Sequence, residues 1–203
     1  MKTNLILSID RRQSAIEAEQ TVDLAIQHMS RGVVGVDLCG DPSKGDVFTF
    51  GEAFKRAKKA GLGVTVHFGE VNGREEEWIE LLAWGPDRLG HVCYVSEPLR
   101  RIIEDRRLGL EFCLSCNVHA GMVGGGFAGH HFGRWWKSGK CPIALCVCIT
   151  HSQGLGWLER LMAGRRMLWV FLRVRLVTSM HLYSSILSCR PRRSVSLRRE
   201  WWI

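Results

Sequence analysis

The sequence lacks the long apolar runs that mark secreted and membrane-spanning chains. Its first apolar run, Leu5–Leu7, is too short for the core of a secretory signal. No stretch reaches the ~18 apolar residues that a spanning helix needs, and the best candidate, 167–177, is interrupted by Arg173 and Arg175. Eight cysteines without such a signal are typical of reduced thiols. We therefore expect a cytoplasmic protein with no membrane partner.

Lysine is absent from the last part of the chain. Residues 147–203 contain ten arginines and two glutamates, whereas residues 1–146 contain 18 basic and 18 acidic side chains. The formal net charge of +8 therefore lies entirely in the tail. Its arginine pairs and Trp201-Trp202 would suit nucleic acid or an anionic membrane. Because no folded partner surface accompanies them, we expect an accidental, disordered basic tail and no nucleic-acid partner.

Six short runs rich in valine, isoleucine and leucine alternate with helical patterns along residues 1–146. Their near-continuous apolar character is typical of parallel strands that are covered on both faces. The predicted strands are 4–9, 33–38, 63–68, 88–91, 110–114 and 142–146.

The segments between these runs have the periodicity of amphipathic helices. Ser14 and Glu17 match a capping box, and Gly32 is expected to end the helix that they begin. The apolar stripes predicted to face the core are Ala18, Val22, Ala25 and Met29; Phe50, Ala53, Phe54 and Ala57; Trp78, Leu81 and Leu82; and, after a Ser96 cap, Leu99, Ile102 and Ile103. This plan predicts an α/β fold: an incomplete (β/α)8 TIM barrel with about six of its eight strands, or an open sheet.

Polar residues lie at the carboxyl ends of the predicted strands, at the edge where α/β folds place their chemistry. A histidine, His67, a carboxyl group, Glu70, and a second histidine, His91, are the parts of a metal-assisted hydrolytic site. Taken singly, each also has a structural reading as a satisfied strand-end histidine or a solvated carboxylate. Together, at successive strand ends, they favour catalysis.

Five segments resemble the adenosine deaminase family, and within it the adenosine deaminase-like branch that deaminates N6-methyl-AMP. The segments are VVGVDLCGDPSKGD, VTVHFGEV, PDRLGH, LEFCLSCNV and HHFGRWWK, and the resemblance spans about residues 4–146. It implies a zinc-dependent barrel in which water attacks purine C6. The products would be IMP from N6-methyl-AMP, or inosine from adenosine.

The resemblance also implies roles for five residues, carried over by position. His67 would be a zinc ligand, Glu70 the proton donor to purine N1, and His91 the base that orients the metal-bound water. Gly40 would contact the purine through its backbone. Asp10 matches a position that contacts substrate.

The chain departs from the family pattern at both ends of the barrel. The family's His-x-His pair has no counterpart, and residues 143–149 carry no acidic group where the family has Thr-Asp-Asp. One of four family ligands survives, whereas a catalytic zinc site needs about three protein ligands. Cys146, Cys148 and His151 are metal-capable in type, but no second pair lies near them. We therefore expect a partial barrel (1–146) with a divergent tail (147–203) that is catalytically incomplete alone; the alternative is a non-enzymatic isoform or a mis-spliced gene fragment.

Three further motifs are not expected to carry chemistry. Gly124–Gly129 matches GxGxxG, but without a strand leading into it we expect a loop rather than a phosphate cradle. Cys113 and Cys116 are predicted to lie on a strand, where an odd separation points them to opposite faces, so we expect no dithiol. His130-His131 are expected to pack or cap, without a catalytic role.

Overall fold

Six parallel strands form the centre of the protein. The computed structural model describes residues 4–146, together with the strand backbone of 172–177 and 181–185. The strands are β1 (Leu5–Asp10), β2 (Val33–Cys39), β3 (Gly63–Phe68), β4 (Arg88–His91), β5 (Gly109–Phe112) and β6 (Ile143–Leu145). Each pairs in parallel with the next one along the chain. All six predicted strands are confirmed, although the predicted bounds of β5 and β6 extend beyond the observed ones.

Two short strands lie within the predicted tail. β7 (Leu172–Val177) pairs in parallel with β1 through Leu176 and Leu7, and β8 (His181–Ser185) pairs antiparallel with β7. The described strands follow the order β6-β5-β4-β3-β2-β1-β7-β8, so the sheet that they form is not closed. The predictions for the rest of the tail, including Cys148 and His151, lie outside the described residues. The division at residue 146 stays a prediction.

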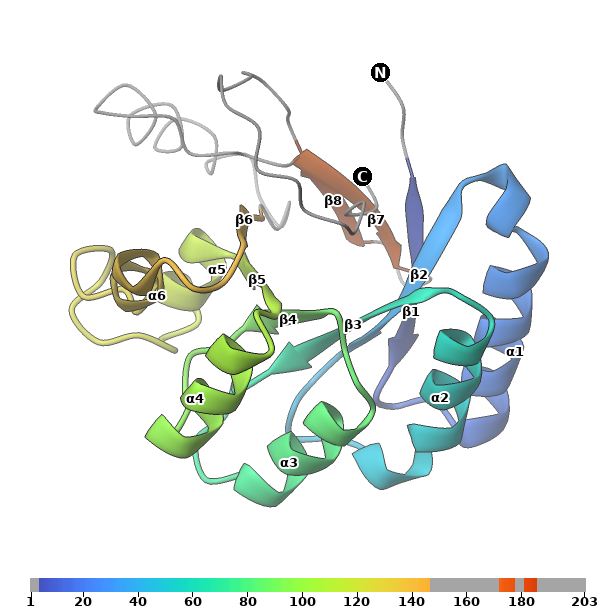
Figure 1. Cartoon of the computed structure of the whole chain (residues 1–203), viewed down its shortest axis with the longest axis horizontal. Helices are drawn as coiled ribbons and strands as arrows, with labels where there is room; N and C mark the ends of the chain where they lie inside the picture. The colour runs from blue at the N-terminus through green and yellow to red at the C-terminus, as the bar shows by residue number, and fades with distance from the viewer. Residues whose placement is uncertain (1–3, 147–171, 178–180, 186–203) are drawn as a thin grey trace.

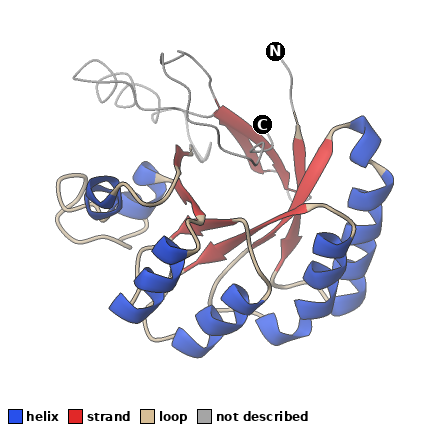
Figure 2. Cartoon of the chain, in the orientation of Figure 1, coloured by secondary structure: helices blue, strands red, loops and turns tan. Residues whose placement is uncertain are grey.

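Helices line the outer side of the curved sheet (Figures 1 and 2). α1 (Ala15–Gln27), α2 (Gly51–Lys59), α3 (Glu75–Ala83) and α4 (Glu97–Asp105) each connect two successive strands, joined by the 3-10 turns η1 (Met29–Arg31) and η2 (Val47–Thr49). α5 (Leu114–His119) and α6 (Phe132–Ser138) lie between β5 and β6. Within the described ranges, no helix has both the length and the apolar character that crossing a membrane requires.

The ends of the helices follow local sequence signals, with some differences. Ser14 and Glu17 form both bonds of the predicted capping box. α1 ends at Gln27, and Gly32 instead ends η1 with a positive φ of 97°. Because the chain has left the α1 stripe by then, Met29 is 37% exposed, and its predicted core position is wrong. Ser96 occupies the N-cap of α4, but its hydroxyl donates to Glu75 rather than capping the helix.

The main core lies between the helices and the outer face of the sheet. Sheet residues such as Ile9, Leu38, Val66 and Leu89 pack in one cluster with the predicted apolar stripes of the helices. Besides Met29, the exception is Ile102, which is 38% exposed although its neighbour Ile103 is fully buried. Within this cluster, Phe54 stacks on Trp84 with ring centroids 4.8 Å apart.

The CxxC spacing lies at the start of a helix and not on a strand. β5 ends at Phe112, Cys113 is the N-cap residue of α5, and Cys116 lies within α5. The predicted strand was too long by two residues, because the apolar Leu114 that extended it belongs to the buried side of α5. The stated reason against a dithiol, that the two side chains leave opposite faces of a strand, is therefore wrong.

Replacing Phe54 with alanine tests the importance of this core. Phe54→Ala leaves a cavity beside Trp84, and we expect the free energy of unfolding to fall by about 3–5 kcal/mol. Phe48→Ala is the matched control, since Phe48 is 58% exposed and its loss should change stability by no more than about 0.5 kcal/mol. Urea unfolding followed by tryptophan fluorescence measures both. Equal effects of the two substitutions would contradict the described core.

Candidate active site

The five predicted site residues lie at the carboxyl ends of neighbouring strands. Asp10 ends β1, Gly40 follows β2, His67 lies near the end of β3, Glu70 follows β3 and His91 ends β4. In a parallel sheet these ends meet at one edge. The structure brings the five residues together in two groups, His67 with Glu70 and His91, and Asp10 with Gly40.

The ring of His67 is hydrogen-bonded to the neighbouring strand, β2. Its Nδ1 atom lies 2.8 Å from the carbonyl oxygen of Leu38 and 3.4 Å from Oδ1 of Asp37. A carbonyl oxygen only accepts, so Nδ1 carries the proton and donates to Leu38. Nε2 of neutral His67 therefore has a lone pair, which is the state that a metal ligand requires.

Glu70 and His91 complete the first group. The His67 and His91 rings lie with centroids 5.0 Å apart, and Glu70 Oε2 is 3.7 Å from His91 Nε2. The side chains of all three are almost completely buried. Two imidazoles and a carboxyl group are thus concentrated in a space from which bulk water is largely excluded.

Asp10 and Gly40 form the second group. Gly40 has a φ of 105°, and a Cβ atom at this position would lie 2.6 Å from Asp10 Oδ1, so only glycine fits. The Asp10 carboxylate accepts from Arg12 Nε and Nη2 at 2.8 and 2.6 Å. This hydrogen bonding lowers the pKa of Asp10. Asp10 is therefore an anion that is already paired with Arg12.

The pKa of the Cys39 thiol is influenced by a carboxylate from each of the two groups. Burial, followed by the charge of Asp10, raises the pKa of its thiol to about 12, and Glu70 contributes in the same direction. The Cys39 thiol is consequently neutral at physiological pH and is no nucleophile.

His91 has an unusual backbone that is held from two sides. His91 and Val92 both have positive φ, 68° and 46°, a conformation that costs non-glycine residues of order 1–3 kcal/mol each. His131 Nε2 donates to the carbonyl oxygen of His91 at 2.7 Å, and Asn117 Nδ2 lies 2.8 Å from Nδ1 of the His91 ring. The segment that carries α5 and α6 thus fixes both the backbone and the ring of His91.

His130 and His131 form a stacked pair beside this site. Their ring centroids are 4.4 Å apart, and both rings contact Phe112. Burial lowers the pKa of His130 to about 4, and burial also lowers the pKa of His131. The pair packs, as predicted, but His131 in addition supports the backbone of His91.

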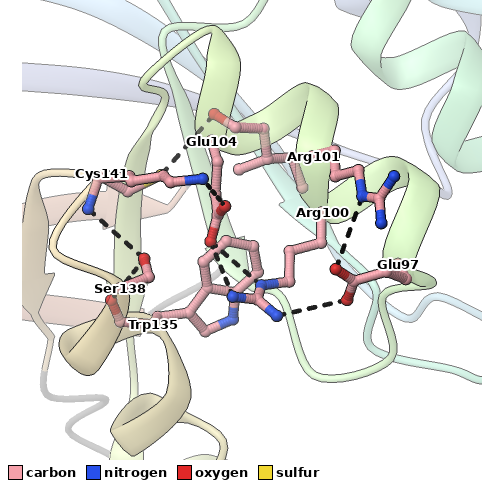
Figure 3. A network of polar contacts seen from close by, with 9 residues as sticks. Glu97, Arg100, Arg101, Glu104, Trp135, Ser138 and Cys141 are labelled. Carbon is pink, nitrogen blue, oxygen red and sulfur yellow. Dashed lines mark hydrogen bonds and ion pairs between the residues drawn. The ribbon is translucent and has the colours of Figure 1, made fainter.

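The far side of α6 is fastened to α4 (Figure 3). Glu104 accepts from Arg100 Nε and Nη2 at 3.1 and 3.0 Å and from Lys140 Nζ at 2.8 Å. The Arg100 guanidinium lies over the Trp135 ring of α6, 5.7 Å from its centroid. Hydrogen bonds from these cations lower the pKa of Glu104.

The Gly124–Gly129 segment lies in the turn-rich connection before α6, as a loop.

A polar row on the inner face of the sheet was missed by the sequence reasoning. Ser8, Asp37 and Thr65 are paired across β1, β2 and β3 and are buried. Thr65 Oγ1 and Arg88 Nη1 both donate to Glu111, at 3.4 and 3.3 Å. The sequence does contain a signal for this row. Side chains two residues apart on a strand lie on the same face, and Asp37 precedes Cys39, and Thr65 precedes His67, by two residues. The inner face is therefore polar, and not apolar as expected.

The described residues do not complete a zinc site. Across 4–146, no group of three or more His, Cys, Asp or Glu side chains is arranged to hold a metal ion. His67 has the lone pair of a ligand, but a catalytic zinc needs about three protein ligands. Of the three alternative ligands considered, only Cys146 lies in the described part of the chain.

Comparisons with known proteins agree with one another. A sequence model of the adenosine deaminase family matches residues 1–126. The N6-mAMP deaminase of Arabidopsis thaliana is 36% identical over 143 residues, which are 70% of this chain and 39% of that protein. A crystal structure of Arabidopsis N6-mAMP deaminase has 35% sequence identity and a TM-score of 0.68, covering 71% of this chain and 42% of the other. The structure of Arabidopsis ADAL in complex with IMP has 34% sequence identity and a TM-score of 0.66, and the match covers 70% of this chain and 41% of ADAL.

These matches cover most of the described chain but a smaller share of the relatives. The chain spans about two fifths of the length of the relatives it matches. The part matched by the family model, residues 1–126, contains β1 to β5 and α1 to α5.

The buried state of His130 predicts a pH dependence of stability. Burial lowers the pKa of His130 from its ordinary value of 6.5 to about 4 in the folded chain, so it favours the neutral ring. This contribution is fully present above about pH 6.5 and is lost as the pH falls toward 4, by up to about 3 kcal/mol at about 1.4 kcal/mol per pKa unit.

Urea unfolding between pH 7 and 4 checks this expectation. His130→Gln should flatten the loss of stability across this range, while His119→Gln, at an exposed histidine, should leave it unchanged. The assignment is wrong if both variants follow the wild-type curve.

Proposed function

Because the chain belongs to the adenosine deaminase family, we propose that it is the part of a hydrolytic deaminase that contacts the purine of an adenine nucleotide. The reaction is the conversion of N6-methyl-AMP to IMP, with adenosine to inosine as the alternative. The resemblance drawn from the five sequence segments is confirmed at the level of the family. The substrate and the roles of individual residues are proposals.

The observation that carries this proposal is the convergence of His67, Glu70 and His91. They come from two strand ends, yet Glu70 Oε2 is 3.7 Å from His91 Nε2 and the two rings are 5.0 Å apart. Purine deamination needs a proton donor for N1 and a group that orients water toward C6. Glu70 fills the first role and His91 the second.

Gly40 and Asp10 contact the purine at the neighbouring strand ends. Gly40 has no side chain, so a flat ring can approach its backbone, and the positive φ of 105° fixes the direction of that backbone. Asp10 is held as an anion by Arg12. It therefore offers the substrate a rigid acceptor at a constant distance from Gly40.

A nucleotide is favoured over a nucleoside by the relatives. Two of the Arabidopsis matches are described as N6-mAMP deaminase, and Arabidopsis ADAL, a further match, was solved with IMP. IMP is the product that the proposed reaction releases. We therefore assign a purine nucleotide as the small-molecule partner.

We propose a bound zinc ion only where further protein ligands join His67. His67 supplies one ligand, and no described group of three metal-binding side chains accompanies it. We therefore propose that this chain by itself is catalytically incomplete. The same observation favours the second candidate, a non-enzymatic isoform that retains purine contacts.

Metal analysis with a turnover assay tests the proposed incompleteness. The purified chain, equilibrated with zinc and desalted, should retain far less than about one zinc per chain, because a catalytic site needs about three protein ligands. It should show no chelator-sensitive release of amine from N6-methyl-AMP. The matched Arabidopsis deaminase serves as the positive control in the same assay.

About one zinc per chain, together with turnover that a chelator abolishes and His67→Ala removes, would overturn the proposed incompleteness. Binding of IMP, followed by titration calorimetry, tests the purine site separately. Gly40→Val should abolish any binding, since its side chain would collide with Asp10. The purine site is refuted if Gly40→Val binds as the wild type does.

A further inference from the structure

Asn117 contacts the ring of His91 and thereby determines how this histidine faces the site. Asn117 lies in α5, is fully buried, and its Nδ2 atom is 2.8 Å from His91 Nδ1. The resemblance assigns no role to this residue. The inference rests on the proposed function, because it concerns the group that orients water there.

The orientation of the Asn117 amide follows from its two neighbours. Nδ2 also lies 3.4 Å from the thioether sulfur of Met122, which only accepts hydrogen bonds. Oδ1 is buried without a hydrogen-bond partner. The opposite orientation would face oxygen with sulfur and bury an NH2 group without an acceptor. The amide therefore donates to His91.

We propose that Asn117 is a positioning residue that fixes the proton of neutral His91 on Nε2. When Nδ1 accepts from Asn117, the ring proton must lie on the other nitrogen. Nε2 faces Glu70 Oε2 at 3.7 Å. His91 consequently presents an N–H group, and not a lone pair, to the interior of the site.

This arrangement makes the two neighbouring histidines complementary. His67 donates through Nδ1 to Leu38 O and so exposes the lone pair of Nε2, whereas His91 exposes an N–H group. The rings lie only 5.0 Å apart. His91 then orients a water oxygen by donating to one of its lone pairs, which differs from the role of a base that the resemblance implies. Glu70 is left as the group that exchanges protons with water and purine.

The protonation of the His91 ring nitrogens can be measured directly. Long-range proton–nitrogen NMR spectra of the 15N-labelled 203-residue chain distinguish a protonated from an unprotonated ring nitrogen, at a pH at which the ring is neutral. We expect Nδ1 of His91 to be unprotonated and Nε2 to be protonated. His91→Gln identifies the two signals.

Two variants separate this positioning from a packing role. Asn117→Asp replaces the donor with an acceptor of the same shape, and we expect the proton to appear on Nδ1. Asn117→Leu keeps the volume without any hydrogen bond, and we expect a mixture of the two tautomers. His130 is an internal reference, because its Nδ1 accepts from the backbone N–H of Phe132 at 3.0 Å, and its signals should stay unchanged.

A protonated Nδ1 in the wild-type chain, or an unprotonated Nδ1 in folded Asn117→Asp, would overturn the proposal. Should both variants fail to fold, the wild-type spectrum alone decides between the two tautomers. The readout requires neither zinc nor turnover. An inactive chain with the expected tautomer would leave Asn117 as a positioning residue, while the turnover assay judges the proposed function.

Discussion

The parallel register between β3 and its neighbours is the constraint on which the site depends. His67 pairs with Gly90 and Phe68 with His91, while Val66 pairs with Leu38 on the other side. Because side chains alternate along a strand, a slip by one residue would turn His67 into the helix layer. The apolar residues that prevent the slip, such as Val64, Val66 and Phe68, are buried in the main core. The packing of one face therefore fixes the chemistry of the other.

The second requirement is support for His91, which leaves the sheet in a strained conformation. That support comes from a segment more than twenty residues away, through Asn117 and His131. α6, which begins after His131, is in turn held to α4 by Arg100, whose guanidinium lies over the ring of Trp135. Surface ion pairs contribute little, but Glu104 of α4 is buried and also bonds Lys140, so it restricts where the chain can lie just after α6.

The sequence predicted what depends on local pattern and on strand ends. Apolar periodicity located all six strands and most of the buried stripes. The spacing of Ser14 and Glu17 located the capping box. The positions of His67, Glu70 and His91 at or just after the carboxyl ends of β3 and β4 were predicted correctly; their roles stay predictions. Met29 and Cys113 were misplaced, since a stripe or a strand was extended past the point where the chain turns. Asp37 and Asn117 were missed for a different reason, because their importance depends on contacts with His67 and His91 that no local pattern contains.

The described part of the site is ordered by bonds within the chain itself. Leu38 determines the proton on His67, and Asn117 determines the proton on His91, so neither orientation requires a metal ion or a substrate. Pre-organised ligands and donors lower the cost of binding, because they are not reordered when the ligand arrives. The described part of the site can therefore keep its geometry by itself. The donor and acceptor directions of its two histidines are set before any ligand binds.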